Sequence, residues 1–345
     1  MKSKPMTKFA ILTLSLILVA CAGGGSEEAG CPAIDGREIN VVATTPMIGE
    51  FVSQVGGENI NLTVLMPPEA NPHTYEPAPQ DAGTIAEADL VFYTGLLYEP
   101  AALVKLLENS ACSTDILSEV GESVFPIEFK EGGHDDHDDH DDHDDHDDEE
   151  GHDDHDDEEG HDDHEGHNHG AYDPHFWFDP SRVAYAAEYI ESRLIQFDPE
   201  NESSYISSAD SFVSELNDLT KQVSELISTV PSQNRKLITT HESLGYLEAK
   251  FGLEVLSTII PSLNSANEIS PSDLAGVIDV IEDNNVKVIF IESEAPSVYS
   301  ETIVAETGIK PVTGLYVETL KPGQSYSEFL ISNVKLITEN LQDTD

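Results

Sequence analysis

Two groups of short β-branched runs, separated by one long helical pattern, constrain the fold of this chain most strongly. The runs occur at residues 39–45, 61–67, 89–95, 236–240, 253–260, 286–292 and 309–318. Amphipathic or acidic helical stretches lie between them, and this alternation is typical of βαβ units around a parallel sheet. The sequence therefore predicts an α/β fold with two (β/α) lobes and mostly parallel central sheets. The lobes are expected at residues 38–197 and 231–345.

The segment between the lobes, residues 198–230, is predicted to be a long helix. After Asp198 and Pro199, no Gly or Pro interrupts the chain as far as Val230, so a helix of about 45 Å is allowed. Apolar or small side chains recur every three or four residues, at Tyr205, Ala209, Phe212, Leu216, Leu219, Val223 and Leu226. The stripe alone fits a packing helix or a coiled-coil seam. Its place between two lobes favours a stiff connector.

The first 20 residues are predicted to be a lipoprotein signal peptide. Three lysines precede a mostly apolar run of residues 9–19, which is too short to span a bilayer as a helix. The following "LVAC" resembles a bacterial lipobox, in which cleavage leaves Cys21 as the lipid-modified N-terminus; an uncleaved anchor is the alternative. Residues 21–37 are interpreted as a flexible tether.

Charge excludes one class of partner. The chain has 16 Lys and Arg against 67 Asp and Glu, giving a formal net charge of -51, whereas nucleic-acid binding requires a basic surface. We therefore expect no nucleic-acid partner.

Much of the acidity lies in a His/Asp-rich tract at residues 134–169. The tract has no apolar residue, so it is predicted to be a disordered loop inserted in the first lobe. Imidazoles beside carboxylates suit Zn²⁺, and such a loop would bind several ions weakly. An acidic solubilising spacer is the alternative. Its histidines are His134, His137, His140, His143, His146, His152, His155, His161, His164, His167 and His169.

Cysteine usage leaves one possible disulfide. If Cys21 carries lipid, Cys31 and Cys112 remain, and export permits them to pair. The chain contains no CxxC, so a structural zinc finger is not expected.

A repeated motif surrounds two of the three histidines outside the tract. "NPHTYEP" at 71–77 contains His73, "DPHFWFDP" at 173–180 contains His175, and His241 follows a predicted strand. A proline restricts the residue before it to extended backbone, so each turn presents its histidine in a fixed direction. Loops at the carboxyl ends of strands are where α/β folds place ligands. The three imidazoles are therefore candidate metal ligands, although two unrelated proline turns remain the alternative.

The neighbours of these histidines suggest supporting roles. Trp177 and adjacent aromatic residues are candidates for a dry wall beside a metal. Glu76 or Asp179 would orient an imidazole N–H, and the Asn or Asp that opens each motif would cap a turn.

These motifs resemble the metal-binding lipoproteins of bacterial ABC uptake systems for zinc and manganese, the cluster A-I substrate-binding proteins. The resemblance covers nearly the whole mature chain. It rests on residues 44–81, the acidic His loop, "DPHFWFDP", residues 197–216, "THESLGYLEAKFGL" at 240–253 and "IFIESEAPS" at 289–297. The family implies two lobes joined by a long rigid helix, with the metal buried in the cleft between them.

The resemblance also implies a ligand set. The first two histidine ligands of the family correspond to His73 and His175. Manganese-type members resemble "EG.F.YF" at the third position and zinc-type members "H..YGYF", whereas this chain has His241 in "HESLGYL". Glu318 in "LYVETL" stands where many members have Asp, so either Glu318 or a water is the fourth ligand. Glu242 and Glu292 are candidates for the layer around the ligands.

The expected function is an extracytoplasmic receptor, lipid-anchored at the periplasmic face or cell surface, that delivers Zn²⁺ to an ABC permease. It is expected to be monomeric. A manganese receptor of the same family and a surface adhesin or passive metal buffer are the alternatives. A metalloenzyme is not expected, because the chain has no HExxH, no nucleophile elbow and no Gly-rich phosphate loop.

Overall fold

The computed structural model describes residues 31, 33–34, 36–68, 70–129, 172–294 and 298–342. Within it, Cys31–Asp345 forms one compact unit. The predicted signal peptide, the lipidation site Cys21, most of the tether and the His/Asp-rich tract lie outside the described residues, so those predictions stay predictions. No helix of the described residues is both long and apolar enough to cross a bilayer.

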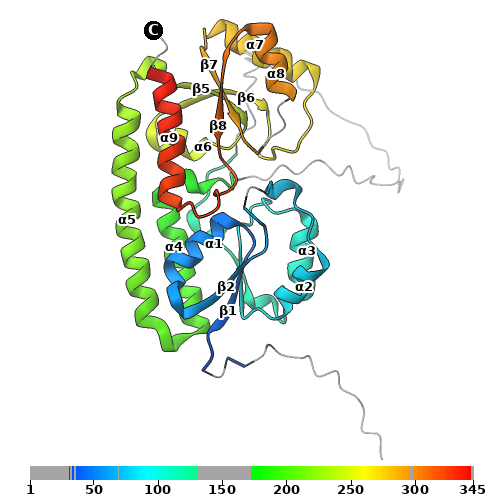
Figure 1. Cartoon of the computed structure of the whole chain (residues 1–345), viewed down its shortest axis with the longest axis vertical. Coiled ribbons are helices and arrows are strands. Elements are labelled where there is room, and N and C mark those ends of the chain that lie inside the picture. Colours follow the sequence, from blue (N-terminus) through cyan, green and yellow to red (C-terminus); the bar gives the residue numbers. More distant parts are fainter. Residues whose placement is uncertain are drawn as a thin grey trace, which may run out of the picture. The chain divides into compact units, whose positions relative to one another are not determined.

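The N-terminal lobe is built on a four-stranded sheet. Its strands are β1 (Ile39–Ala43), β2 (Ile60–Val64), β3 (Leu90–Tyr93) and β4 (Leu117–Glu119), in the order β2-β1-β3-β4. All three pairings are parallel, as predicted. The helices α1 (Pro46–Gly56), α2 (Pro79–Ala86) and α3 (Ala101–Ser110) connect and flank these strands (Figure 1).

The C-terminal lobe repeats this plan with two parallel strand pairs. The strand β5 (Lys236–His241) pairs with β6 (Glu254–Ile260), and β7 (Val288–Glu292) pairs with β8 (Lys310–Leu315). The strands β5 and β7 lie side by side. The helices of this lobe are α6 (Gly245–Phe251), α7 (Pro271–Asp283), α8 (Val298–Thr307) and α9 (Tyr326–Gln342).

Two long helices lie on the same side of the molecule, and the second of them runs along both lobes (Figure 1). The helix α4 (Pro180–Phe197) leads into α5 (Glu202–Ser228), which packs against α4, α1 and α9. The phenyl ring of Phe51 in α1 lies 6.3 Å from that of Phe212 in α5 and 5.3 Å from the ring of Tyr326 in α9, between ring centroids. One apolar core therefore extends from the first lobe through α5 into the second.

A disulfide joins Cys31 to Cys112, just after α3, across a sequence separation of 81 residues. A cross-link over a long loop stabilises the fold mainly by restricting the unfolded chain. We expect Cys31→Ser to lower the free energy of unfolding by about 2–4 kcal/mol in a urea titration. The unsubstituted protein under reducing conditions serves as the control and should match the variant; an unchanged urea midpoint would contradict the prediction.

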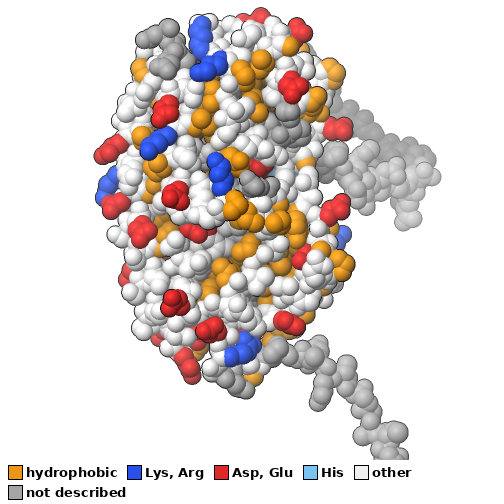
Figure 2. Space-filling view, in the orientation of Figure 1, with side chains coloured by type: hydrophobic (Ala, Val, Ile, Leu, Met, Phe, Trp, Pro, Cys, Tyr) orange, Lys and Arg blue, Asp and Glu red, His pale blue; other side chains and the backbone are white. Residues whose placement is uncertain are grey.

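The surface agrees with the composition. Asp and Glu side chains are spread over the face shown in Figure 2, and Lys and Arg side chains are fewer there.

Candidate metal centre

Four side chains that are distant in the sequence meet between the lobes. The N-terminal lobe contributes His73 and His175, and the C-terminal lobe contributes His241 and Glu318. One ligand atom from each lies within 4.8 Å of the others. The side chains of His175, His241 and Glu318 are fully buried and that of His73 is 3 % exposed. These four residues are called the four-residue cluster below.

The two repeated motifs position their histidines in the same way. Asn71 precedes a short 3-10 helix, Pro72–Thr74, and its side-chain Oδ1 accepts a hydrogen bond from the backbone N–H of His73 at 2.9 Å. Asp173 accepts a hydrogen bond from the backbone N–H of His175 at 2.8 Å. The first residue of each motif therefore caps the turn that its proline stiffens, and the following histidine points toward the cluster.

Carboxylates hold two of the three imidazoles. The Nδ1 atom of His175 lies 2.8 Å from Oδ1 of Asp173, and Nδ1 of His241, at the end of β5, contacts Oε2 of Glu292, at the end of β7. The backbone N–H of His241 also donates to Oε1 of Glu292 at 3.1 Å. Because the carboxylate accepts a hydrogen bond from the N–H at Nδ1, the lone pair of each neutral ring lies on Nε2 and is directed toward the cluster.

The Nε2 atoms converge on the carboxylate of Glu318. Its Oε1 lies 3.1 Å from Nε2 of His73 and 2.9 Å from Nε2 of His241, and its Oε2 lies 3.5 Å from Nε2 of His175. Nevertheless, Nε2 of His175 and of His241 make no hydrogen bond with any described residue, although both are buried. Buried polar atoms without a partner are rare, and a cation bound among them would satisfy both.

Charge within the cluster shifts the proton affinities of its members. Burial alone would lower the pKa of His175, but the nearby carboxylates of Glu318 and Asp173 outweigh it and raise the pKa to about 9. Burial alone would also lower the pKa of His241. The charges of Glu292 and Glu318 outweigh this effect and raise the pKa of His241 well above its usual value. Burial would raise the pKa of Glu318, but the three imidazoles hold it well below its usual range. The cluster without metal therefore retains protons on the imidazoles of His175 and His241 at neutral pH.

Two of the residues that were predicted to surround the ligands, Glu292 and Trp177, lie beside the imidazoles. Glu292 contacts His241, as described above. The ring of Trp177 lies 5.5 Å from that of His175, and its Nε1 donates to the backbone O of Val317 at 2.8 Å. Trp177 is completely buried, in keeping with the predicted dry wall.

Three of the predicted supporting residues do not contact the imidazoles. Asp179 caps α4 instead, accepting from the backbone N–H of Ser181 at 2.9 Å. Glu76 is exposed to solvent and makes no described contact with His73. Glu242 accepts a hydrogen bond from Oγ1 of Thr258 at 3.0 Å. The expected orienting role of Asp179 is corrected, because Asp173 occupies the Nδ1 side of His175. That of Glu76 is not found, because its side chain is exposed to solvent.

Two residues beside the cluster were not predicted. The hydroxyl of Tyr98 donates to Oε2 of Glu318 at 2.9 Å. Oε1 of Glu294 accepts from the backbone N–H groups of Val317 and Glu318, at 3.2 and 3.3 Å. Burial, together with the charges of Glu318 and Glu292, raises the pKa of Glu294 to about 8. Tyr98 stands in none of the motifs described above, and Glu294 lies in "IFIESEAPS", where Glu292 rather than Glu294 was singled out.

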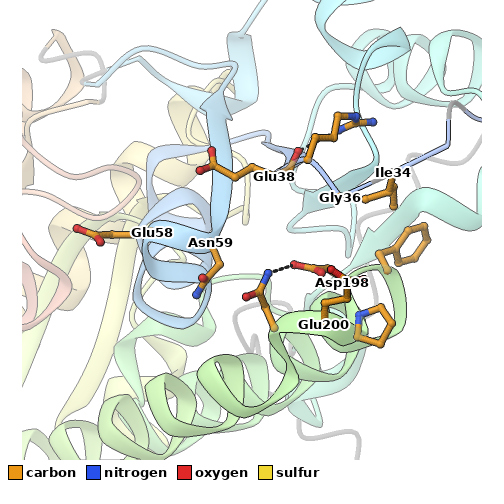
Figure 3. Close-up of a pocket in the computed structure, with 11 residues that line it drawn as sticks. Ile34, Gly36, Glu38, Glu58, Asn59, Asp198 and Glu200 are labelled. Atoms are coloured by element: carbon orange, nitrogen blue, oxygen red, sulfur yellow. Dashed lines mark hydrogen bonds between the residues drawn. The ribbon is translucent and has the colours of Figure 1, made fainter.

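A cavity of about 590 Å³ reaches the cluster at His73. Its lining includes His73, Tyr98, Glu119 and Asn264, but none of the other three cluster residues. A separate cavity of about 390 Å³ lies where β1 begins and α4 meets α5, and it contains no histidine (Figure 3). This cavity therefore gives access to the cluster past His73.

Comparison with known proteins places this arrangement in a family. The chain is 26% identical over 347 residues to the manganese ABC transporter substrate-binding lipoprotein PsaA of Streptococcus anginosus, covering 98% of this chain and 99% of that one. It resembles the structure of the periplasmic zinc-binding protein TroA of Treponema pallidum, with a TM-score of 0.72, 20% identity and coverage of 88% and 99%. It also resembles Fe(III)-bound YtgA of Chlamydia trachomatis, with a TM-score of 0.71, 24% identity and coverage of 88% and 98%.

A family profile also matches most of the chain. The profile described as ZnuA, zinc-uptake complex component A, periplasmic, matches residues 41–340, which include both lobes, α5 and the whole four-residue cluster. The chain therefore belongs to the ZnuA family of metal-binding, substrate-binding proteins of ABC transporters.

Proposed function

We propose that this protein is a lipid-anchored, extracytoplasmic receptor that binds Zn²⁺ with His73, His175, His241 and Glu318 and delivers it to an ABC permease. The observation that carries the proposal is the convergence of three imidazoles and one carboxylate within 4.8 Å of one another in a buried site. Tetrahedral sites built from nitrogen and carboxylate ligands suit Zn²⁺. The ion is the cargo of this protein rather than a resident cofactor.

The arrangement around the ligands supports ion capture. Two carboxylates fix the tautomers of His175 and His241 and increase the basicity of their Nε2 atoms. Tyr98 and Glu294 hold the side chain and backbone of Glu318 in place. These contacts prepare the cluster for a cation, and family membership makes the protein a receptor rather than an enzyme.

Manganese is the second candidate cargo. The S. anginosus relative is named for manganese and the two structural neighbours for zinc and iron(III), so the names of relatives do not select one ion. Carboxylates favour Mn²⁺, whereas imidazoles favour Zn²⁺, and this cluster has three imidazoles and one carboxylate. The preference for zinc therefore rests on His241.

The remaining parts of the proposal concern segments outside the described residues. Lipid on Cys21 would keep the receptor at the membrane beside its permease, and the His/Asp-rich tract would concentrate ions near the cleft. A monomer is sufficient for this role, because all four cluster residues belong to one chain.

Competitive titration of Zn²⁺ and Mn²⁺ tests the proposal. The protein should start at Ser26 and lack residues 134–169, so that weak binding by the tract does not hide the cluster. One tight zinc site that outcompetes manganese is the expected result. A tighter manganese site would reassign the cargo. If the protein that lacks the tract shows no tight binding, the protein is instead a passive metal buffer.

A further inference from the structure

The turn that holds His73 also reaches across to the other lobe. The Nδ2 atom of Asn71 donates to Oγ of Ser265 at 3.0 Å, and it lies 3.4 Å from the backbone O of Glu294. The orientation of the Asn71 amide is fixed by its neighbour, because its Oδ1 accepts from the backbone N–H of His73. The NH₂ group must then face the C-terminal lobe.

The two residues that Asn71 contacts belong to loops of the C-terminal lobe, and these loops help to position His241 and Glu318. Ser265 is buried, and its loop is anchored through Ser262, whose backbone O accepts from the N–H of Glu242 at 3.0 Å, directly after His241. The side chain of Glu294 accepts from the backbone N–H of Glu318 at 3.3 Å. One amide therefore touches the segment of His73 and the segments that position His241 and Glu318.

His73 differs from the other two imidazoles in ways that make this contact important. It is the only cluster residue that lines the 590 Å³ cavity. Among the described residues, no carboxylate contacts its Nδ1 atom, whereas Asp173 and Glu292 hold those of His175 and His241. The placement of His73 therefore depends on its turn, and an ion that uses this cavity passes the turn as it enters or leaves.

We propose that Asn71 is a positioning residue that acts as a latch between the lobes: its Oδ1 holds the His73 turn, and its NH₂ group fastens that turn to Ser265 and slows the loss of the bound ion. The inference rests on the proposed function, because it concerns the retention of the same ion. It predicts an effect on the dissociation rate of the metal.

Two substitutions distinguish the contact of Asn71 with Ser265 from its hydrogen bond with the backbone of His73. Asn71→Ser leaves a hydroxyl that is able to cap the His73 turn but too short to reach Ser265. Ser265→Ala removes the other end of the contact without altering the turn. Asn61→Ser is the matched control, since the amide of Asn61 donates to Asn40 on the exposed side of the N-terminal sheet. Each variant of the full chain is loaded with one equivalent of Zn²⁺, and an excess of chromophoric chelator reports dissociation by stopped flow.

Loss of one hydrogen bond predicts a dissociation rate about five- to tenfold faster for Asn71→Ser and for Ser265→Ala. The double variant should be no faster than the quicker single variant, because both substitutions break the same contact. Asn61→Ser should release zinc at the parental rate. A merely structural role of either residue would not produce this coupling.

Other outcomes refute the latch. An unchanged rate for Ser265→Ala, or rate increases that multiply in the double variant, would show that Asn71 and Ser265 do not act together. If the unsubstituted protein has no tight zinc site, the proposed function fails and the latch fails with it. If zinc binds tightly and only the rates are insensitive, the latch alone is rejected.

Discussion

Replacing His241 with alanine is expected to weaken zinc binding by roughly a thousandfold or more. Substitution of a residue that only orients a ligand typically costs about 10- to 100-fold in metal affinity, and loss of a ligand removes a direct bond to the ion. The loss also leaves the buried carboxylate of Glu292 without its imidazole partner. Competition against a chelator of known affinity, in the protein that lacks residues 134–169, measures the change.

The control for this experiment is Glu76→Ala. Glu76 lies in the first histidine motif, three residues after His73, but it is exposed. Its removal should change zinc affinity by less than about threefold, as expected for a surface substitution. Tight binding that survives His241→Ala would show that the four-residue cluster is not the main site.

Zinc affinity is expected to fall steeply as the pH decreases. The pKa of His175 is raised to about 9 and that of His241 well above its usual value, so in the cluster without metal His175 carries a proton below about pH 9 and His241 also holds its proton more tightly than an ordinary imidazole. Metal binding requires neutral imidazoles and must release these protons. Affinity should therefore rise with pH up to about 9, by about tenfold per pH unit for each proton released.

Two measurements check this linkage in the protein without the tract. Titrations at pH 6, 7 and 8, corrected for the protonation of the competing chelator, should show a decrease of about a hundredfold per unit toward acid. Calorimetry in two buffers of different ionisation enthalpy should detect about two protons released per Zn²⁺. An affinity that does not depend on pH, with no buffer effect, would contradict the assigned protonation of the cluster.

The sequence predicted the regular part of the fold well, because periodicity reports which side chains are buried. The strand runs and the α/β class are confirmed. The strand β4 was not predicted, since its three residues, "LSE", carry no hydrophobic pattern. The buried stripe of α5 ends at Ile227 rather than Leu226. A repeat of 3.5 residues drifts about 20° per heptad against a straight helix, and over three heptads this drift moves the buried side by about one residue.

The candidate site was predictable only where local chemistry marks it. The Pro-His motifs and the strand-end His241 carry such marks, and the structure brings these three histidines together with Glu318. Asp179 was predicted to orient the imidazole of His175, but Asp173, the other aspartate of the same motif, does so. The turn at Phe176–Phe178 decides it, because it places Asp179 at the start of α4. Tyr98 and Glu294 become neighbours of Glu318 only through tertiary folding.

The continuous core on the α5 side limits how far the lobes can separate. Phe51, Phe212 and Tyr326 come from the first lobe, α5 and α9, and their rings are in contact. A wide swing of the lobes would expose this apolar surface to water at a cost of about 25 cal/mol for each Å². On the proposed function, exchange of the ion would therefore need only a small local rearrangement at the His73 turn. A permease would then have to recognise the loaded receptor by small differences in its surface rather than by a large change in shape.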